Sequence, residues 1–264
     1  MTTSRTCAYC DGQTSLTREH VWPGCFLERM GRKAAHFSHQ AGKAHGADYV
    51  VADVCAACNN SILDELDTYF CTMYDQYFAH ARDFGSTVAF QYDFHRLTRA
   101  LLKIAYNSAR AISSEHGYLR ALRSYVLQGK PAPEQIALFA ELVSPTLVAD
   151  PDEPSGKRKV MPNGLYRSAV TQLTTPHGER LRTRFISVNS FYFHLALPSG
   201  PLRLDEFEEA SNEIEHFVEG VVRLREQTHS VTLHTSPQDA ISSFLPHIQK
   251  HRDEYESFFA RPKK

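Results

Sequence analysis

Two cysteine pairs with the same spacing, Cys7-Ala-Tyr-Cys10 and Cys55-Ala-Ala-Cys58, constrain the fold of this chain more than any other feature. Two intervening residues allow a tight turn that points both sulfurs at one centre, and two such pairs supply the four thiolates of a tetrahedral zinc site. The segment between them, residues 11–54, exceeds the roughly 15–20 residues that separate the pairs of a simple zinc ribbon. We therefore expect one four-cysteine zinc site with a folded segment between its halves.

Composition sets wide limits on the rest of the chain. The 264 residues are 42% hydrophobic and 22% charged, which is typical of a globular protein with one large or two small domains. A net charge of -1 provides no global cationic field, so any contact with nucleic acid must come from local patches. There is no basic segment followed by an apolar run at the N-terminus and no apolar run of membrane-spanning length, so we expect a cytoplasmic protein with no membrane partner.

The cysteine count favours metal ligands over disulfides. Four of the six cysteines fall in the two pairs, a pattern expected of a metalloprotein in a reducing compartment. Cys25 and Cys71 remain, and both lie among apolar residues. We interpret them as buried thiols that behave as small apolar side chains and have no nucleophilic role.

Two short motifs accompany the cysteine pairs. Glu19-His20-Val-Trp-Pro23 follows the first pair, and Asn59 directly follows the second. Together with the cysteines, these motifs resemble the cysteine-bearing branch of the HNH endonucleases, which are built on the ββα-metal (His-Me) finger. The resemblance covers about the first quarter of the chain. It implies metal-dependent hydrolysis of nucleic-acid phosphodiester bonds, with DNA as the expected substrate.

The resemblance also implies a role for each residue that it matches. His20 would be the general base, and Glu19 and Asn59 would hold a catalytic Mg²⁺ or Mn²⁺. The cysteines would hold a separate structural Zn²⁺, with the ligands Cys7, Cys10, Cys55 and Cys58. Thiolates suit zinc, whereas carboxylate and amide oxygens suit a hard cation, so ligand chemistry would separate the two metals.

The chain departs from the family pattern at one position. In many members an asparagine a few residues before the second cysteine pair fixes the loop that carries the base, and no asparagine is found there. Asp48, Asp53 or a backbone group could replace it. A second ligand pair for the cation, Asn60 with Asp64 one helical turn later, is also open, although a solvated polar stripe is the simpler interpretation.

A non-catalytic module competes with a free-standing endonuclease, and a nuclease that acts with a partner is a third interpretation. The missing asparagine and the neutral net charge favour a non-catalytic zinc module that binds nucleic acid or a protein partner. By analogy alone, the chain could instead be the nuclease component of a defence or mobile-element system, acting with a protein partner or as a homo-oligomer.

The remaining sequence completes an α+β prediction in three parts: an HNH finger over 1–80, a helical support region over 81–147 and a mixed strand and helix region over 148–264. We expect Lys103, Asn107 and Arg110 to lie on the exposed face of a long helix, where they could contact phosphates. Residues 148–164 are rich in proline and glycine and are interpreted as a linker or a long surface loop.

Periodicity and turn residues place the other elements. The expected helices cover residues 61–77, 97–112, 118–128, 136–142, 207–224 and a last segment that Ser236 and Pro237 open. The expected strands cover residues 86–92, 165–173, 181–188, 191–197 and 230–234.

Overall fold

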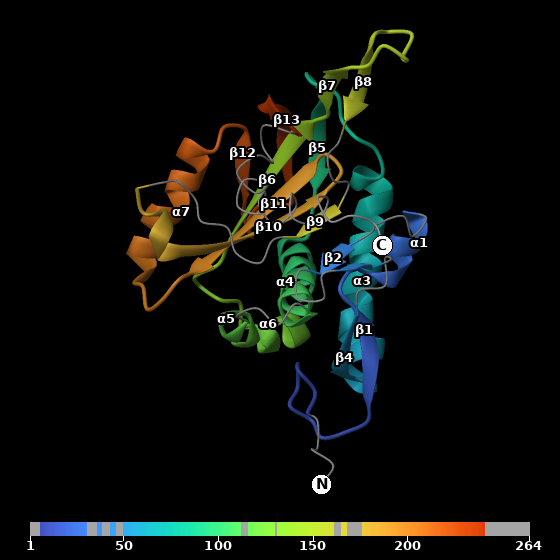
Figure 1. Cartoon of the computed structure of the whole chain (residues 1–264). Helices are drawn as coiled ribbons and strands as arrows, with labels where there is room; N and C mark the ends of the chain where they lie inside the picture. The colour runs from blue at the N-terminus through green and yellow to red at the C-terminus, as the bar shows by residue number, and fades with distance from the viewer. Residues whose placement is uncertain are drawn as a thin grey trace. The chain divides into compact units, whose positions relative to one another are not determined.

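The computed structural model describes residues 6–30, 36–38, 43–45, 50–111, 116–129, 131–160, 165–167 and 176–240, with backbone alone for 36–38, 43–45 and 165–167. The described chain is a mixed α+β protein, as predicted (Figure 1). Within these ranges, no helix combines the length and the apolar character needed to cross a bilayer.

The fold divides into two compact units. Unit 1 comprises Met1–Tyr77, Gln91–Ile136 and Arg225–His229, and unit 2 comprises Phe78–Phe90, Ala137–Leu224 and Ser230–Lys264. The two Cys-x-x-Cys pairs, called knuckles below, and the long helix that follows them in sequence therefore belong to the same unit. The three-part division at residues 80 and 147 stays a prediction.

Unit 1 contains a two-stranded antiparallel sheet between the cysteine pairs. Strand β1 (Leu16–His20) pairs with β4 (Val50–Cys55), with Leu16 opposite Cys55 and His20 opposite Val50. The inserted segment between these strands carries a second hairpin, β2 (His36–Ser38) with β3 (Lys43–His45). Strand β4 ends at Cys55, the first residue of the second cysteine pair. Its pairing with β1 therefore brings that cysteine beside Leu16, six residues after Cys10.

A helix follows the second cysteine pair, as predicted, but begins earlier than residue 61. It consists of α2 (Ala56–Cys58), a π-helical turn η1 (Asn59–Leu63), α3 (Asp64–Met73) and a second π-helical turn η2 (Tyr74–Phe78). Helices α1 (Gly24–Arg29) and α4 (Phe94–Ala111) both pack against α3.

Aromatic packing fixes the segment that follows β1. Trp22 and Phe26 are buried, and their rings lie 6.0 and 5.6 Å from the ring of Phe70 on α3. Tyr74 completes the group, 5.0 Å from Phe26 in an edge-to-face arrangement. Buried aromatic pairs of this kind contribute beyond their area burial, so the chain leaving His20 is anchored on α3.

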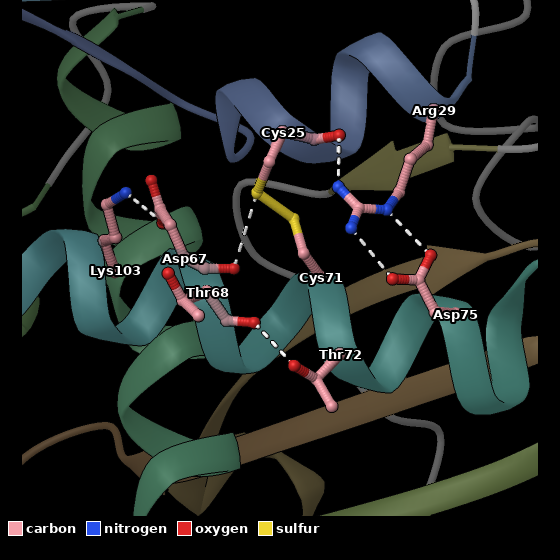
Figure 2. Close-up of a disulfide and its surroundings, with 8 residues drawn as sticks. All are labelled: Cys25, Arg29, Asp67, Thr68, Cys71, Thr72, Asp75 and Lys103. Atoms are coloured by element: carbon pink, nitrogen blue, oxygen red, sulfur yellow. Dashed lines mark hydrogen bonds and ion pairs between the residues drawn. A yellow bond between two sulfur atoms is a disulfide. The ribbon is translucent and has the colours of Figure 1, made fainter.

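A disulfide between Cys25 and Cys71 joins α1 to α3, so the prediction of two free buried thiols was wrong (Figure 2). One turn further along each helix, Arg29 donates to both carboxylate oxygens of Asp75, at 2.7 and 2.8 Å. Spacing along the sequence cannot identify such a pair, because the two cysteines meet only after α1 has folded onto α3.

Removing this disulfide tests its contribution to stability. A bridge that closes a 46-residue separation is expected to stabilise the fold by about 4 kcal/mol on the loop-entropy account. In zinc-loaded protein purified without reductant, Cys25→Ser combined with Cys71→Ser should lower the free energy of unfolding by up to that amount, measured with urea. The same variant compared with reduced parent is the control and should show little difference. Six titratable thiols in the unreduced, zinc-free parent would contradict the pairing.

The helix expected at 118–128 is two short helices, and the second ends at Gly129 as predicted. Helices α5 (Gly117–Arg120) and α6 (Arg123–Gln128) occupy the expected 118–128 segment. Gly129 follows in the left-handed region with φ of 70°, where a side chain would also approach Arg99 Nη1 at 3.1 Å. Glycine is the residue that ends a helix in this conformation without strain.

Unit 2 is built on a sheet with the strand order β5-β13-β6-β11-β10-β9, and β12 also pairs with β6. The hairpin of β10 (Leu181–Val188) and β11 (Phe191–Pro198) confirms two predicted strands. Helix α7 (Leu204–Phe217) packs on β10 and β12 (Figure 1). The other strands are β5 (Thr87–Gln91), β6 (Ala137–Ser144), β9 (Leu165–Arg167), β12 (Val221–Leu224) and β13 (Ser230–Asp239).

Two segments before residue 165 differ from the predictions. The expected helix at 136–142 is strand β6, which is buried along its whole length between β11 and β13. A strand buried on both faces has no polar alternation, so its apolar run resembles a buried helix. The expected linker at 148–164 contains the hairpin of β7 (Thr146–Ala149) and β8 (Lys157–Val160).

Two later segments also differ. The helix expected to reach residue 224 ends at Phe217, and the chain turns at Gly220, whose φ is 82°, before β12 begins. The helix expected from Ser236 is instead the continuation of β13, and the residues beyond 240 lie outside the described structure.

Candidate functional site

The four predicted zinc ligands come together in unit 1. The sulfur atoms of Cys7, Cys10, Cys55 and Cys58 all lie within 4.8 Å of one another, and the Cys10 and Cys55 sulfurs are 3.7 Å apart. Zinc–sulfur bonds of about 2.3 Å in a tetrahedron place sulfurs about 3.8 Å apart. The cluster therefore has the geometry and the ligand chemistry of a site that could hold zinc.

Backbone groups at this cluster favour a thiolate at Cys7. The Cys55 amide donates to Cys7 Sγ at 3.3 Å. Burial alone would raise the pKa of Cys7, but backbone hydrogen bonds, with that of Cys55 first, lower its pKa to about 7. Burial and the neighbouring thiols raise the pKa of Cys58 far above its usual range. Four thiolates this close repel one another without a cation, so the cluster suits a divalent metal.

His20, the predicted base, ends strand β1 and is half-buried. The next two residues, Val21 and Trp22, are fully buried. The His20 ring lies near Gly24, where an added Cβ would stand 3.8 Å from Nδ1. Because the backbone on its C-terminal side is anchored in the core, His20 has a defined position.

Glu19 faces the interior beside Lys103. The Glu19 carboxylate is 4% exposed and lies 2.5 Å from Lys103 Nζ, which also pairs with Asp67 (Figure 2). Burial raises the pKa of Asp67 to about 6, against the opposing effect of Lys103. Glu19 is thus neutralised by a cation of the chain itself, and its role as a metal ligand stays a prediction.

Asn59 begins the π-helical turn and reaches back to β1. Its Nδ2 donates to Thr17 Oγ1 at 2.9 Å and to the Arg18 carbonyl at 3.0 Å. These contacts place Asn59 beside the strand that carries Glu19 and His20. These contacts use the amide nitrogen, and Oδ1 is the side-chain atom that would bind a cation. The alternative pair, Asn60 and Asp64, is solvent-exposed.

Three polar residues of α4 were predicted to be exposed, but they are buried. Lys103 and Asn107 are 1% and 0% exposed, and the Arg110 side chain is 6% exposed, so the prediction of phosphate contacts on an exposed face was wrong. Their spacing puts them on one face of the helix. This face turns inward because it meets acidic residues of other elements, namely Glu19, Asp53 and Asp67, so the sequence of α4 alone does not indicate its burial.

The group on α4 also bears on the missing asparagine. Asn107 Nδ2 donates to the His20 carbonyl at 3.0 Å. Asp53, a candidate substitute, instead pairs with Arg110 at 3.1 Å, and Asp48 lies outside the described residues. A side chain from a different part of the chain therefore holds the backbone of the predicted base.

Comparison of the chain with protein-family models, with curated proteins and with solved structures finds no match.

Proposed function

We propose that this chain is an HNH-type endonuclease, a metal-dependent phosphodiesterase that cleaves nucleic acid, with DNA as the expected substrate. The observation that carries the proposal is the position of Asn59, whose side chain binds the backbone of β1 at Arg18, two residues before His20. A candidate cation ligand that directly follows the second cysteine pair thus contacts the strand that carries the candidate base. Zinc binding alone does not require either residue there.

In the proposed reaction, neutral His20 accepts a proton from the water that attacks phosphorus. Its half-buried ring and anchored backbone hold the accepting nitrogen in a limited range of positions, which lowers the entropic part of the barrier. A Mg²⁺ or Mn²⁺ held by Asn59 and Glu19 would stabilise the charge of the transition state and of the leaving 3′ oxygen. The Asn59 amide oxygen suits such a cation, whereas Glu19 must first exchange its contact with Lys103.

The Lys103 contact favours the second candidate, a zinc module that binds nucleic acid or protein without cleaving it. A buried ammonium between Glu19 and Asp67 already supplies the positive charge that the two carboxylates need. In that case Asn59 serves only to hold β1 to the helix.

Two substitutions of Asn59 distinguish a cation-binding role of this residue from a structural one. Asn59→Ala removes both the oxygen and the donor to β1, whereas Asn59→Asp keeps an oxygen ligand and loses the donor. A cation role predicts that Asn59→Ala loses about 10- to 100-fold of cleavage and regains part of it at high Mg²⁺ or Mn²⁺, and that Asn59→Asp retains more activity at low metal. Zinc-loaded protein should be assayed on supercoiled plasmid, linear duplex, single-stranded DNA and structured RNA.

The matched control is Asp64→Ala, an exposed position on the same run of helix, which should have little effect. Equal losses in Asn59→Ala and Asn59→Asp at every metal concentration would assign Asn59 a purely structural role. A large loss in Asp64→Ala would move the cation to the Asn60 and Asp64 pair.

A further inference from the structure

Asn107 on α4 is fully buried and uses its whole side-chain amide within unit 1. Its Nδ2 donates to the His20 carbonyl at 3.0 Å and lies 3.5 Å from Glu19 Oε1. Its Oδ1 accepts from the Tyr9 hydroxyl at 2.7 Å and from Arg110 Nη2 at 3.0 Å. The amide thus donates a hydrogen bond to a partly buried backbone carbonyl where β1 ends and helps to hold the backbone there.

Tyr9 links the same amide to the zinc cluster. It stands between Cys7 and Cys10 in the first knuckle and is 1% exposed. Its ring packs edge-to-face on Tyr106 of α4 at 5.4 Å, which leaves the hydroxyl in place for Asn107. Two hydrogen bonds, Tyr9 to Asn107 and Asn107 to His20, therefore connect the first knuckle to the predicted base.

Arg110 fixes the orientation of this chain of bonds. Its guanidinium lies 4.0 Å from the centre of the Tyr106 ring and pairs with Asp53 on β4 at 3.1 Å. From there it donates to Asn107 Oδ1. Two donors on the oxygen require the amide nitrogen to face His20, so the direction of the Asn107 side chain is determined by its surroundings.

We propose that Asn107 is a positioning residue that holds the His20 backbone and couples it to the first zinc knuckle through Tyr9. The inference rests on the proposed function, in which His20 is the base. Zinc then affects cleavage in two ways: it stabilises the fold, and it sets the place of the base. Removing the amide donor weakens one of the restraints on the His20 backbone, and the imidazole shifts with its own backbone.

Asn107→Asp tests this inference, because it keeps the acceptor for Tyr9 and Arg110 and replaces the donor to His20 with an oxygen. We expect kcat to fall about 10- to 100-fold with little change in KM and with full zinc content. In a His20→Ala background the same substitution should change cleavage less than twofold, because the group through which it acts is gone. Equal losses in both backgrounds would overturn the inference in favour of general destabilisation.

Two hydroxyl deletions provide a second, milder comparison. Tyr9→Phe removes one hydrogen bond to Asn107 and should lower kcat about 2- to 10-fold. Tyr106→Phe is the matched control. Tyr106 lies on α4 beside Asn107, but its hydroxyl donates to the Ala8 carbonyl and not to the Asn107 side chain. If Asn107→Asp does not fold, this pair decides the question, and equal activity of the two variants overturns the inference.

Nuclear magnetic resonance of His20 separates this inference from the proposed function. The His20 carbonyl and ring signals should shift in Asn107→Asp and Tyr9→Phe and stay in place in Tyr106→Phe. Those shifts in a protein that cleaves no nucleic acid would support the positioning of His20 and reject the endonuclease. Unchanged His20 signals in folded, zinc-loaded Asn107→Asp would overturn the positioning role, whatever the protein cleaves.

Discussion

Cys58→Ser is expected to lose the metal and much of the folded structure of unit 1 together. The four thiols meet only in the folded chain, so the free energy of zinc binding is also free energy of folding, on the order of 10–16 kcal/mol for structural zinc in zinc-finger peptides. The parent should contain about one zinc per chain by elemental analysis. The variant should contain almost none and should unfold at a much lower temperature.

The control for this experiment is a variant without the two disulfide-bonded cysteines. Cys25→Ser combined with Cys71→Ser removes two cysteines that form a disulfide outside the cluster, and should leave the zinc content unchanged. A variant with serine at all four of these positions that folds fully without metal would contradict a structural role for zinc.

Each half of the four-cysteine cluster could be predicted because its determinants are local. Each pair needs only a tight turn, and the sequence displays both turns as the same Cys-x-x-Cys spacing. The β10–β11 hairpin was predictable for a similar reason, since Asn189, with φ of 49°, marks a turn between two apolar runs. Local signals of this kind survive any tertiary context.

Features that depend on tertiary contact were missed or misassigned. Strand β6 has polar Glu141 in an apolar run, but every residue of the strand is buried, so neither face has the polar alternation that would identify a strand. Cys25 and Cys71 lie 46 positions apart, and nothing in the sequence between them indicates their pairing. Burial of Lys103 likewise depends on carboxylates that come from β1 and α3.

The side chain that holds the His20 backbone shows the same limit of sequence-based prediction within the site. The sequence pattern directs attention to the strand before Cys55, where Asp53 is the described candidate. The structure provides the bond to His20 from α4, through Asn107, and uses Asp53 to hold Arg110 behind it. A function expected of one segment can be supplied by another whenever its side chain reaches the same carbonyl.

His20→Ala is expected to lower cleavage about 10²- to 10⁴-fold, the usual contribution of a positioned base. The His20 ring is half-buried and lies at the edge of the core, near Gly24. Zinc content, thermal unfolding and nucleic-acid binding should therefore stay close to those of the parent. The loss should persist at high Mg²⁺ or Mn²⁺, because metal cannot replace the proton acceptor. This distinguishes it from Asn59→Ala, where added metal restores part of the activity.

His229→Ala is the matched control, because this histidine is exposed in unit 1 and its backbone carbonyl, not its ring, binds Tyr92. It should cleave as the parent does. Equal cleavage by His20→Ala and the parent on every duplex and single strand, in matched metal, would reject the proposed mechanism. If neither protein cleaves but both bind nucleic acid with the same affinity, the zinc module becomes the better account, because base chemistry then contributes nothing that binding requires.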